Sequence, residues 1–144
     1  MKVVLDASVI IKWFVADQEE FLDEALLLYQ HIRDGHVEVI QPLHWQAEVL
    51  AVLTRKFKPE YMEEPLMLLE GFEFKVINHP DIYRRAINIS SLLEHHLFDT
   101  LYLGLALEQK AMLVTDDRKF FRKAEKIGNI CLLQDWRPAA AADS

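Results

Sequence analysis

The chain has 144 residues, of which 51% are hydrophobic and 27% are charged. This composition excludes a disordered chain and predicts one soluble domain over residues 1–137, followed by a flexible tail at 138–144. The net charge of −7 excludes nucleic-acid binding by the whole surface, and it leaves room for a carboxylate cluster that a cation neutralises.

The predicted elements alternate between strand and helix. Val3–Leu5 is apolar without alternation, which is typical of a strand buried on both faces, and a helical stretch follows from Val9. Asp17 and Glu20 have capping-box spacing and predict a helix that runs to about Arg33. The other predicted strands are 37–40, 74–77, 112–114 and 130–133, and the other predicted helices are 42–56, 59–69, 81–94, 99–109 and 118–127. This order predicts an α/β fold with a central parallel sheet and helices on both faces.

Acidic residues directly follow two of the predicted strands. Asp6 comes after Val3–Leu5, and Asp116 and Asp117 come after the strand that ends near Thr115. Open α/β sheets bind ligands at the carboxyl ends of their strands, so these carboxylates are expected at one edge. The alternative is that each Asp caps the helix that follows it.

Asp99 is the one charged residue in the apolar segment 97–107. A segment that is apolar all round predicts a buried helix, where an ionised carboxylate is costly unless it is paired or bound to metal. Asp99 is therefore either a metal ligand or the N-cap of its helix, and one residue can be both.

Glu48 shares a helical stripe with His44 and Arg55, bounded by apolar residues on both sides. The stripe is either a solvated face with a loose ion pair or a narrow polar strip that faces a site.

Several kinds of site are excluded. The four glycines stand too far apart for a dinucleotide fingerprint or a P-loop, and the single Cys131 cannot form an internal disulfide. Asp6 and Lys12 interrupt the N-terminal apolar stretch, so we expect no signal peptide, and the longest apolar run is too short to cross a membrane. We therefore expect a cytoplasmic protein.

The histidines show no zinc-binding spacing, and the neighbours His95 and His96 are not expected to share a helix face, so we assign no histidine to catalysis. A dense basic stretch follows Asp117. It is either a solvated helix face or a phosphate-binding surface, with Arg118, Arg122 and Lys123 as the RNA-binding residues, and a second basic strip is Arg55, Lys56 and Lys58.

Four blocks now stand in order along the chain: Leu5–Val9, Glu48 within a helix, Phe98–Ala106 and Leu113–Asp117. Together they resemble the signature blocks of PIN-domain nucleases, and most closely those of VapC-type toxins from bacterial and archaeal toxin–antitoxin pairs. The resemblance runs from Lys2 to about Leu133. It implies a PIN-like three-layer sandwich and a metal-dependent endoribonuclease.

The resemblance also implies the site. Its acidic residues are Asp6, Glu48, Asp99 and Asp117, with Ser8 and Thr115 in support. Because hard cations select oxygen ligands, the expected cofactor is Mg²⁺ or Mn²⁺, with Glu48 binding it directly or through water. The implied partners are RNA, a VapB-like antitoxin and a second copy of the chain. Apolar residues that either join the core or line a partner surface are Trp13, Phe14, Phe21, Tyr61, Met62, Leu66, Met67 and Phe72.

Other functions have specific requirements. A haloacid-dehalogenase-like phosphatase needs a second Asp two positions after the first, where this chain has Ser8. A response-regulator receiver needs paired acids after its first strand, but Asp6 is followed by Ala7. A PIN domain that serves only as a binding module usually lacks some of the four acids. A PIN-domain RNA-processing nuclease without an antitoxin stays open as an alternative.

Overall fold

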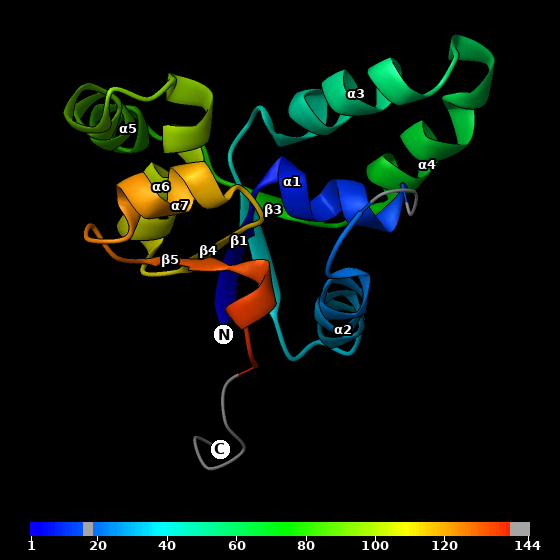
Figure 1. The fold of residues 1–144 in the computed structure, drawn as a ribbon, viewed down its shortest axis with the longest axis horizontal. Coiled ribbons are helices and arrows are strands. Elements are labelled where there is room, and N and C mark those ends of the chain that lie inside the picture. The colour runs from blue at the N-terminus through cyan, green and yellow to red at the C-terminus, as the bar shows by residue number, and fades with distance from the viewer. Residues whose placement is uncertain (16–18, 139–144) are drawn as a thin grey trace.

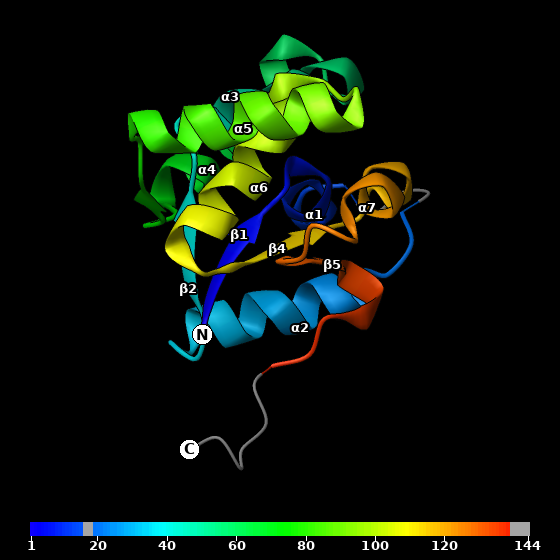
Figure 2. The ribbon, with the colours of Figure 1, turned by 90° about the vertical axis from the view of Figure 1, so that its left-hand side faces the viewer.

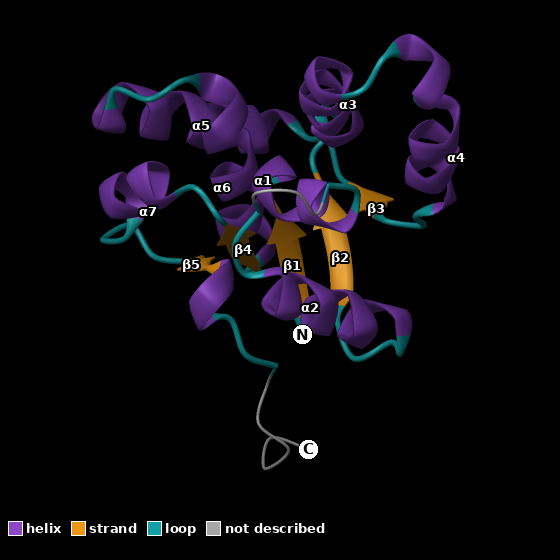
Figure 3. Cartoon of the chain, turned by 45° about the vertical axis from the view of Figure 1, so that its right-hand side comes forward, coloured by secondary structure: helices purple, strands orange, loops and turns teal. Residues whose placement is uncertain are grey.

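A single parallel sheet forms the centre of the computed structural model, which describes residues 1–15 and 19–138. Within that part of the chain the sheet has five strands in the order β3-β2-β1-β4-β5, all parallel (Figure 3). The strands are β1 (Lys2–Leu5), β2 (Glu38–Gln41), β3 (Lys75–Val76), β4 (Met112–Thr115) and β5 (Ile130–Leu132). The predicted α/β fold with a parallel sheet is confirmed.

Helices cover both faces of this sheet. The α-helices are α1 (Ala7–Ile10), α2 (Leu22–Arg33), α3 (Trp45–Lys56), α4 (Glu63–Gly71), α5 (Pro80–Leu93), α6 (Leu97–Gln109) and α7 (Arg118–Ala124). Three short 3₁₀ turns are η1 (Ile11–Trp13), η2 (Pro59–Tyr61) and η3 (Leu133–Asp135). In Figure 1, α2 and α4 lie on one side of the strands, and α5, α6 and α7 lie on the other. Right-handed crossovers produce this division, because the chain moves outward from β1 to β3 and then returns to β4.

The core is built on the central strand. Val3, Val4 and Leu5 of β1 are completely buried, as expected of a strand covered on both faces. Asp6 follows at the carboxyl end of β1, and α3 and α5 stand above this end of the sheet (Figures 1 and 2).

Helix α6 is buried along most of its length and packs closely on α5. At the crossing, a Cβ on Gly104 would lie 2.9 Å from the carbonyl oxygen of Ile82, so this position needs glycine. Nearby, the hydroxyl of Thr100 donates to the carbonyl of Ala86 at 3.0 Å. These contacts fix the N-terminal turn of α6, which carries Asp99, against the α5 layer.

Some predicted boundaries are wrong for identifiable reasons. The helix predicted at 59–69 is two elements, η2 and α4, interrupted at Met62. In one continuous helix Pro65 would lie in the interior and remove a hydrogen bond, whereas the interruption puts it in the first turn of α4. The second predicted helix begins at Leu22, after Phe21 in the left-handed region, with no side-chain cap. Asp17, the proposed cap, lies outside the described residues.

Other boundaries shift by a few residues. The first helix begins at Ala7 rather than Val9, α3 begins at Trp45 rather than Pro42, and α7 ends at Ala124 rather than Ile127. The last strand ends at Leu132, because Leu133 opens η3. Among the described residues, none of the helices is long and apolar enough to cross a membrane.

Candidate metal centre

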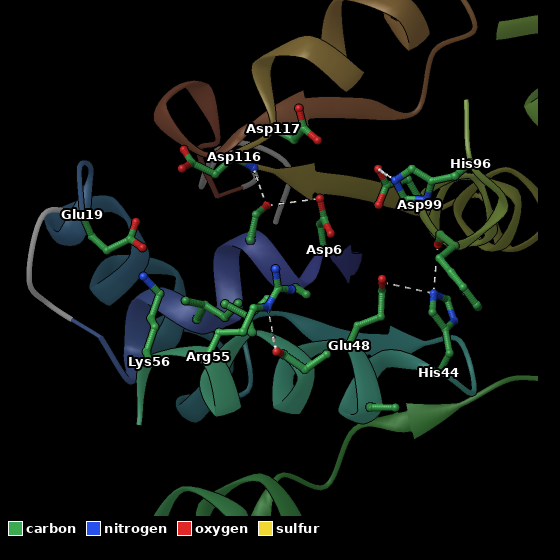
Figure 4. A pocket seen from close by; sticks show the side chains of 17 residues that line it. Asp6, Glu19, His44, Glu48, Arg55, Lys56, His96, Asp99, Asp116 and Asp117 are labelled. Atoms are coloured by element: carbon green, nitrogen blue, oxygen red, sulfur yellow. Dashed lines mark hydrogen bonds and ion pairs between the residues drawn. The ribbon is translucent and has the colours of Figure 1, made fainter. Parts of the chain in front are cut away.

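A cavity of about 880 Å³ opens at the carboxyl edge of the sheet, between α1, α3 and the start of α6 (Figure 4). The backbone N–H of Asp6 donates to the carbonyl of Val114 at 3.1 Å, so the ends of β1 and β4 are joined where the acidic residues begin. The acidic side chains that line the cavity are Asp6, Glu19, Glu48, Asp99, Asp116 and Asp117. All four predicted site acids therefore face one cavity.

Asp6 is held by two hydroxyl groups. Thr115 and Ser8 donate to its Oδ2 at 2.7 and 3.1 Å, and Ser8 in turn accepts from the backbone N–H of Asp116 at 2.9 Å. Thr115 accepts in the same way from the N–H of Asp117 at 3.1 Å. Both residues predicted to support the site contact its central acid. Burial raises the pKa of Asp6 from 3.8 to about 7, with Asp99 and Glu48 adding to the rise.

Three carboxylates converge in the cavity. Asp6, Glu48 and Asp99 each offer an oxygen, and these oxygens lie within 4.8 Å of one another. Asp6 does not cap α1 with its side chain, and Asp99 is the third residue of α6 rather than its N-cap. For these two acids the capping interpretation is therefore wrong.

Asp117 lies apart from that group of described residues. It is the N-cap of α7, and its Oδ1 accepts from the N–H of Phe120 at 3.0 Å. The capping interpretation holds for this residue. Because a carboxylate has further acceptor positions, Asp117 can still face the cavity that it lines.

The donor set fits a hard divalent cation. All three converging groups offer carboxylate oxygens, which Mg²⁺ and Mn²⁺ prefer. Glu48 Oε1 is buried and accepts no hydrogen bond of good geometry within the described part of the chain. His44 Nε2 lies 3.3 Å from this oxygen, but it is directed to the carbonyl of Phe98 at 2.9 Å. A buried acceptor that has only this long contact is incompletely satisfied, so a bound cation would complete this site.

Histidines surround the acids, and the sequence interpretation missed them. His95 Nε2 and His96 Nε2 lie 2.7 and 2.9 Å from Asp99 Oδ2, and the two rings stack with centroids 4.7 Å apart. These neighbours reach one oxygen without sharing a helix face, because they precede α6 instead of lying along it. The pairs His44–Glu48 and His95–Asp99 share a spacing of four residues, which was the signal available in the sequence.

The two outer acids respond differently to their histidines. Burial raises the pKa of Glu48, but the contact with His44, 3.3 Å from its Oε1, outweighs burial and leaves the pKa below its ordinary value. For Asp99, burial outweighs the lowering contributions of His95 and His96, so its pKa is raised.

A second acidic group at the same edge contains its own cation. The side chain of Lys12 is fully buried and contacts Glu19 Oε2 at 2.9 Å and Asp116 Oδ2 at 3.0 Å. Burial lowers the pKa of Lys12, but its hydrogen bonds to Glu19 and Asp116 outweigh this and raise it, so Lys12 stays an ammonium. Burial also raises the pKa of Asp116, although Lys12 lowers it. We call Lys12, Glu19 and Asp116 the Lys12 cluster.

The basic residues predicted on α7 do not line the cavity. Arg118 contacts Glu20 and Gln134, Lys123 contacts His95, and Arg122 is exposed. Among the described lining residues, the arginine and lysine are Arg55 and Lys56 of α3, from the second basic strip (Figure 4). The cations beside the acids come from α3 because its C-terminal turn passes the cavity.

The apolar residues singled out in the sequence differ in their burial: Phe21 and Met62 pack against the core, and Leu66 is half-buried. Trp13, Phe14 and Phe72 pack on the core and also line a groove of about 370 Å³ with Lys12, Leu22, Leu26, Tyr29 and Leu68. Tyr61 and Met67 are exposed. Lys12 lines this groove and also contacts Asp116, so the groove adjoins the Lys12 cluster.

Comparison with solved structures identifies chains of the same fold. A chain of a toxin–antitoxin complex from Klebsiella pneumoniae superposes with a TM-score of 0.65 and 18% identity, over 91% of this chain and 97% of that one. A chain of VapBC2 from Rickettsia felis, bound to a DNA fragment from its promoter, gives 0.64 and 17%, over 92% and 97%. A protein from Pyrobaculum aerophilum gives 0.62 and 16%, over 93% and 90%.

At the level of sequence, no curated protein matches the chain. The sequence model of the PIN domain, however, matches residues 3–126, which extend from β1 through α7 and include all four site acids. The protein therefore belongs to the PIN domain family.

Proposed function

We propose that this protein is a metal-dependent endoribonuclease that hydrolyses RNA phosphodiesters, and that it is the toxin of a type II toxin–antitoxin pair acting in the cytoplasm. The observation that supports the nuclease is the convergence of Asp6, Glu48 and Asp99, whose carboxylate oxygens lie within 4.8 Å of one another in a cavity. Membership of the PIN family supports the same activity.

Asp6, Glu48 and Asp99 would hold Mg²⁺ or Mn²⁺, with Asp117 at the rim of the same cavity. When bound, such an ion activates water and stabilises negative charge on the attacked phosphate. Ser8 and Thr115 keep Asp6 in place, and Glu48 would orient the attacking water. Arg55 and Lys56 hold the RNA backbone that the acidic surface repels.

The nuclease is tested with purified protein and a labelled RNA in Mg²⁺, Mn²⁺ or EDTA. We expect cleavage with either ion, none in EDTA, and a loss of at least about a hundredfold in Asp6→Asn and Asp99→Asn, because ligands of one site act as a unit. The matched control is Asp81→Asn, an exposed acid on α5. Full activity in EDTA, or in either site variant, would overturn the proposal.

The toxin assignment rests on the solved chains of the same fold, two of which come from toxin–antitoxin complexes, one of them VapBC2. The groove at Trp13, Phe14 and Phe72 offers an apolar surface to an antitoxin segment. The test is co-expression with the product of the neighbouring gene: a small DNA-binding protein that co-purifies and inhibits cleavage is expected. Cleavage without any such inhibitor would favour the RNA-processing alternative. The phosphatase alternative has no support, because Ser8 stands where a second Asp is needed and donates to Asp6.

A further inference from the structure

His95 is a largely buried histidine beside the proposed metal centre, and the proposed chemistry does not use it. It lies in the turn between α5 and α6, its side chain is 10% exposed, and its ring packs on Phe120 of α7 with centroids 4.6 Å apart. Its two ring nitrogens point to different partners. Nε2 lies 2.7 Å from Asp99 Oδ2, and Nδ1 lies 3.3 Å from Lys123 Nζ.

The chemistry of the partners fixes the direction of both hydrogen bonds. An ammonium group has donors and no acceptor, so Lys123 donates and His95 Nδ1 accepts. A neutral imidazole that accepts at Nδ1 carries its hydrogen on Nε2, and that hydrogen is then donated to Asp99. Lys123 also reaches the carbonyl of Glu94 at 3.4 Å, which keeps its ammonium beside the turn.

We propose that His95 is a positioning residue for the metal centre and that Lys123 acts through it. The donated hydrogen bond holds the Asp99 carboxylate where it meets Asp6 and Glu48. This inference rests on the proposed metal-dependent function and adds residues outside the four acids. It also gives Lys123 a role inside the protein in place of the predicted contact with RNA.

His96 provides a natural comparison. Its Nε2 lies 2.9 Å from the same oxygen of Asp99, but its side chain is 60% exposed. Water can replace an exposed donor, whereas a donor packed under Phe120 has no such substitute. Helix α7 carries Asp117 at its N-cap and Lys123 in its last turn, so one helix supports the acids on both sides of the cavity.

The test measures the Kd for Mn²⁺ of the full chain by electron paramagnetic resonance, without RNA. Wild type binds Mn²⁺ and Asp99→Asn binds it far more weakly if the proposed centre is real. His95→Leu is expected to raise the Kd about tenfold, as loss of a hydrogen-bond partner of a metal ligand does. His95→Gln is expected to stay within about threefold of wild type, because its amide can donate in place of Nε2. His96→Leu, the matched control, is also expected to stay within about threefold.

Lys123→Met decides whether Lys123 acts through His95. Removal of a positive charge near a cation site would by itself lower the Kd, whereas loss of the Lys123–His95 bond raises it. We expect a higher Kd in Lys123→Met and no further rise when Lys123→Met is added to His95→Leu. Lys119→Met, an exposed lysine on the same helix, is the control. The Lys123 variant also keeps the test decisive if His95→Leu does not fold.

The outcomes separate the two proposals. If wild type binds no Mn²⁺, or Asp99→Asn binds it as well as wild type, the metal centre itself is wrong. If those two behave as expected but His95→Leu binds like wild type, or His95→Gln is as weak as His95→Leu, the positioning role of His95 is wrong. A Kd for Lys123→Met at or below that of wild type overturns the role of Lys123.

Discussion

Two groups of carboxylates share the carboxyl edge of the sheet, and they differ in what neutralises them. In the Lys12 cluster a fully buried ammonium lies within 3.0 Å of Glu19 and Asp116. Asp6, Glu48 and Asp99 converge without a lysine or arginine among them, and burial raises the pKa of Asp6 to about 7. The chain supplies a lysine for one group, and the other group is the one that we propose to bind an ion from solution.

The largest effect is expected when the central acid, Asp6, is neutralised. Without metal, Asp6→Asn is expected to stabilise the fold, by at most about 4 kcal/mol above pH 7, because a pKa raised from 3.8 to about 7 means that the buried charge costs free energy. Between these values the folded state holds a proton that the unfolded state has lost, so wild-type stability rises as pH falls from 7 to 4. The gain from Asp6→Asn should therefore disappear near pH 4. Urea unfolding in EDTA at several pH values measures it, and a pH-independent gain would contradict the prediction.

Removal of the internal cation should have the opposite sign. Lys12→Met leaves Glu19 and Asp116 without their partner and is expected to destabilise the fold by about 3 kcal/mol at pH 7, since breaking a buried ion pair leaves an uncompensated charge. Lys119→Met, on the exposed face of α7, should change the free energy of unfolding by less than about 0.5 kcal/mol. Equal effects of the two variants in urea unfolding would show that Lys12 is not an internal counter-ion.

Addition of Mg²⁺ tests which of the two carboxylate groups binds the ion. Mg²⁺ at ten times its Kd should stabilise wild type by about 1.4 kcal/mol and Lys12→Met by a similar amount, because the ion binds the folded state at the other group. Asp6→Asn should show no such gain. The measurement is the free energy of unfolding with and without Mg²⁺. A gain that is lost in Lys12→Met and kept in Asp6→Asn would show that the ion binds at the Lys12 cluster, and it would contradict the prediction.

The smallest expected effect concerns the cations of α3. Arg55→Ala and Lys56→Ala should each reduce the salt dependence of RNA binding by about 0.7 in the log–log slope, the value for one phosphate contact on a single strand. The Asp6→Asn background prevents cleavage during the measurement. Arg122→Ala, on the exposed face of α7, is the control. If Arg122→Ala changes the slope and the α3 variants do not, RNA follows α7, as the sequence suggested.

The sequence is most informative where one local rule is enough. The apolar run of β1 and the position of Asp6 directly after it predict the strand, its burial and the edge where the acid lies. The interruption of the 59–69 helix was also predictable, because Pro65 cannot lie in a helix interior. Asp117 shows the limit of such rules, because it both caps α7 and lines the cavity, and the sequence rule for a cap cannot exclude the second role.

What the sequence could not supply depends on tertiary placement. His95 reaches Asp99 because the chain turns between α5 and α6 and starts α6 at Leu97, two residues earlier than expected. The density of basic residues on α7 predicts an RNA surface, which stays a prediction, whereas the contacts of Lys123 with His95 and of Arg118 with Glu20 could not be read from the sequence. The direction of a side chain on a short helix depends on the residues that pack against the helix. The number of basic residues in the sequence does not contain that information.

The strand order also determines when the acidic residues can come together during synthesis of the chain. The hydrogen bond from Thr115 to Asp6 joins residues 109 positions apart, and β4 inserts beside β1 only after α5 and α6 have been made. A growing chain thus exposes Asp6 and Glu48 well before Asp99 and Thr115 emerge from the ribosome, and long-range pairing of this kind forms slowly. A nascent chain that still lacks β4 therefore has no assembled acidic centre.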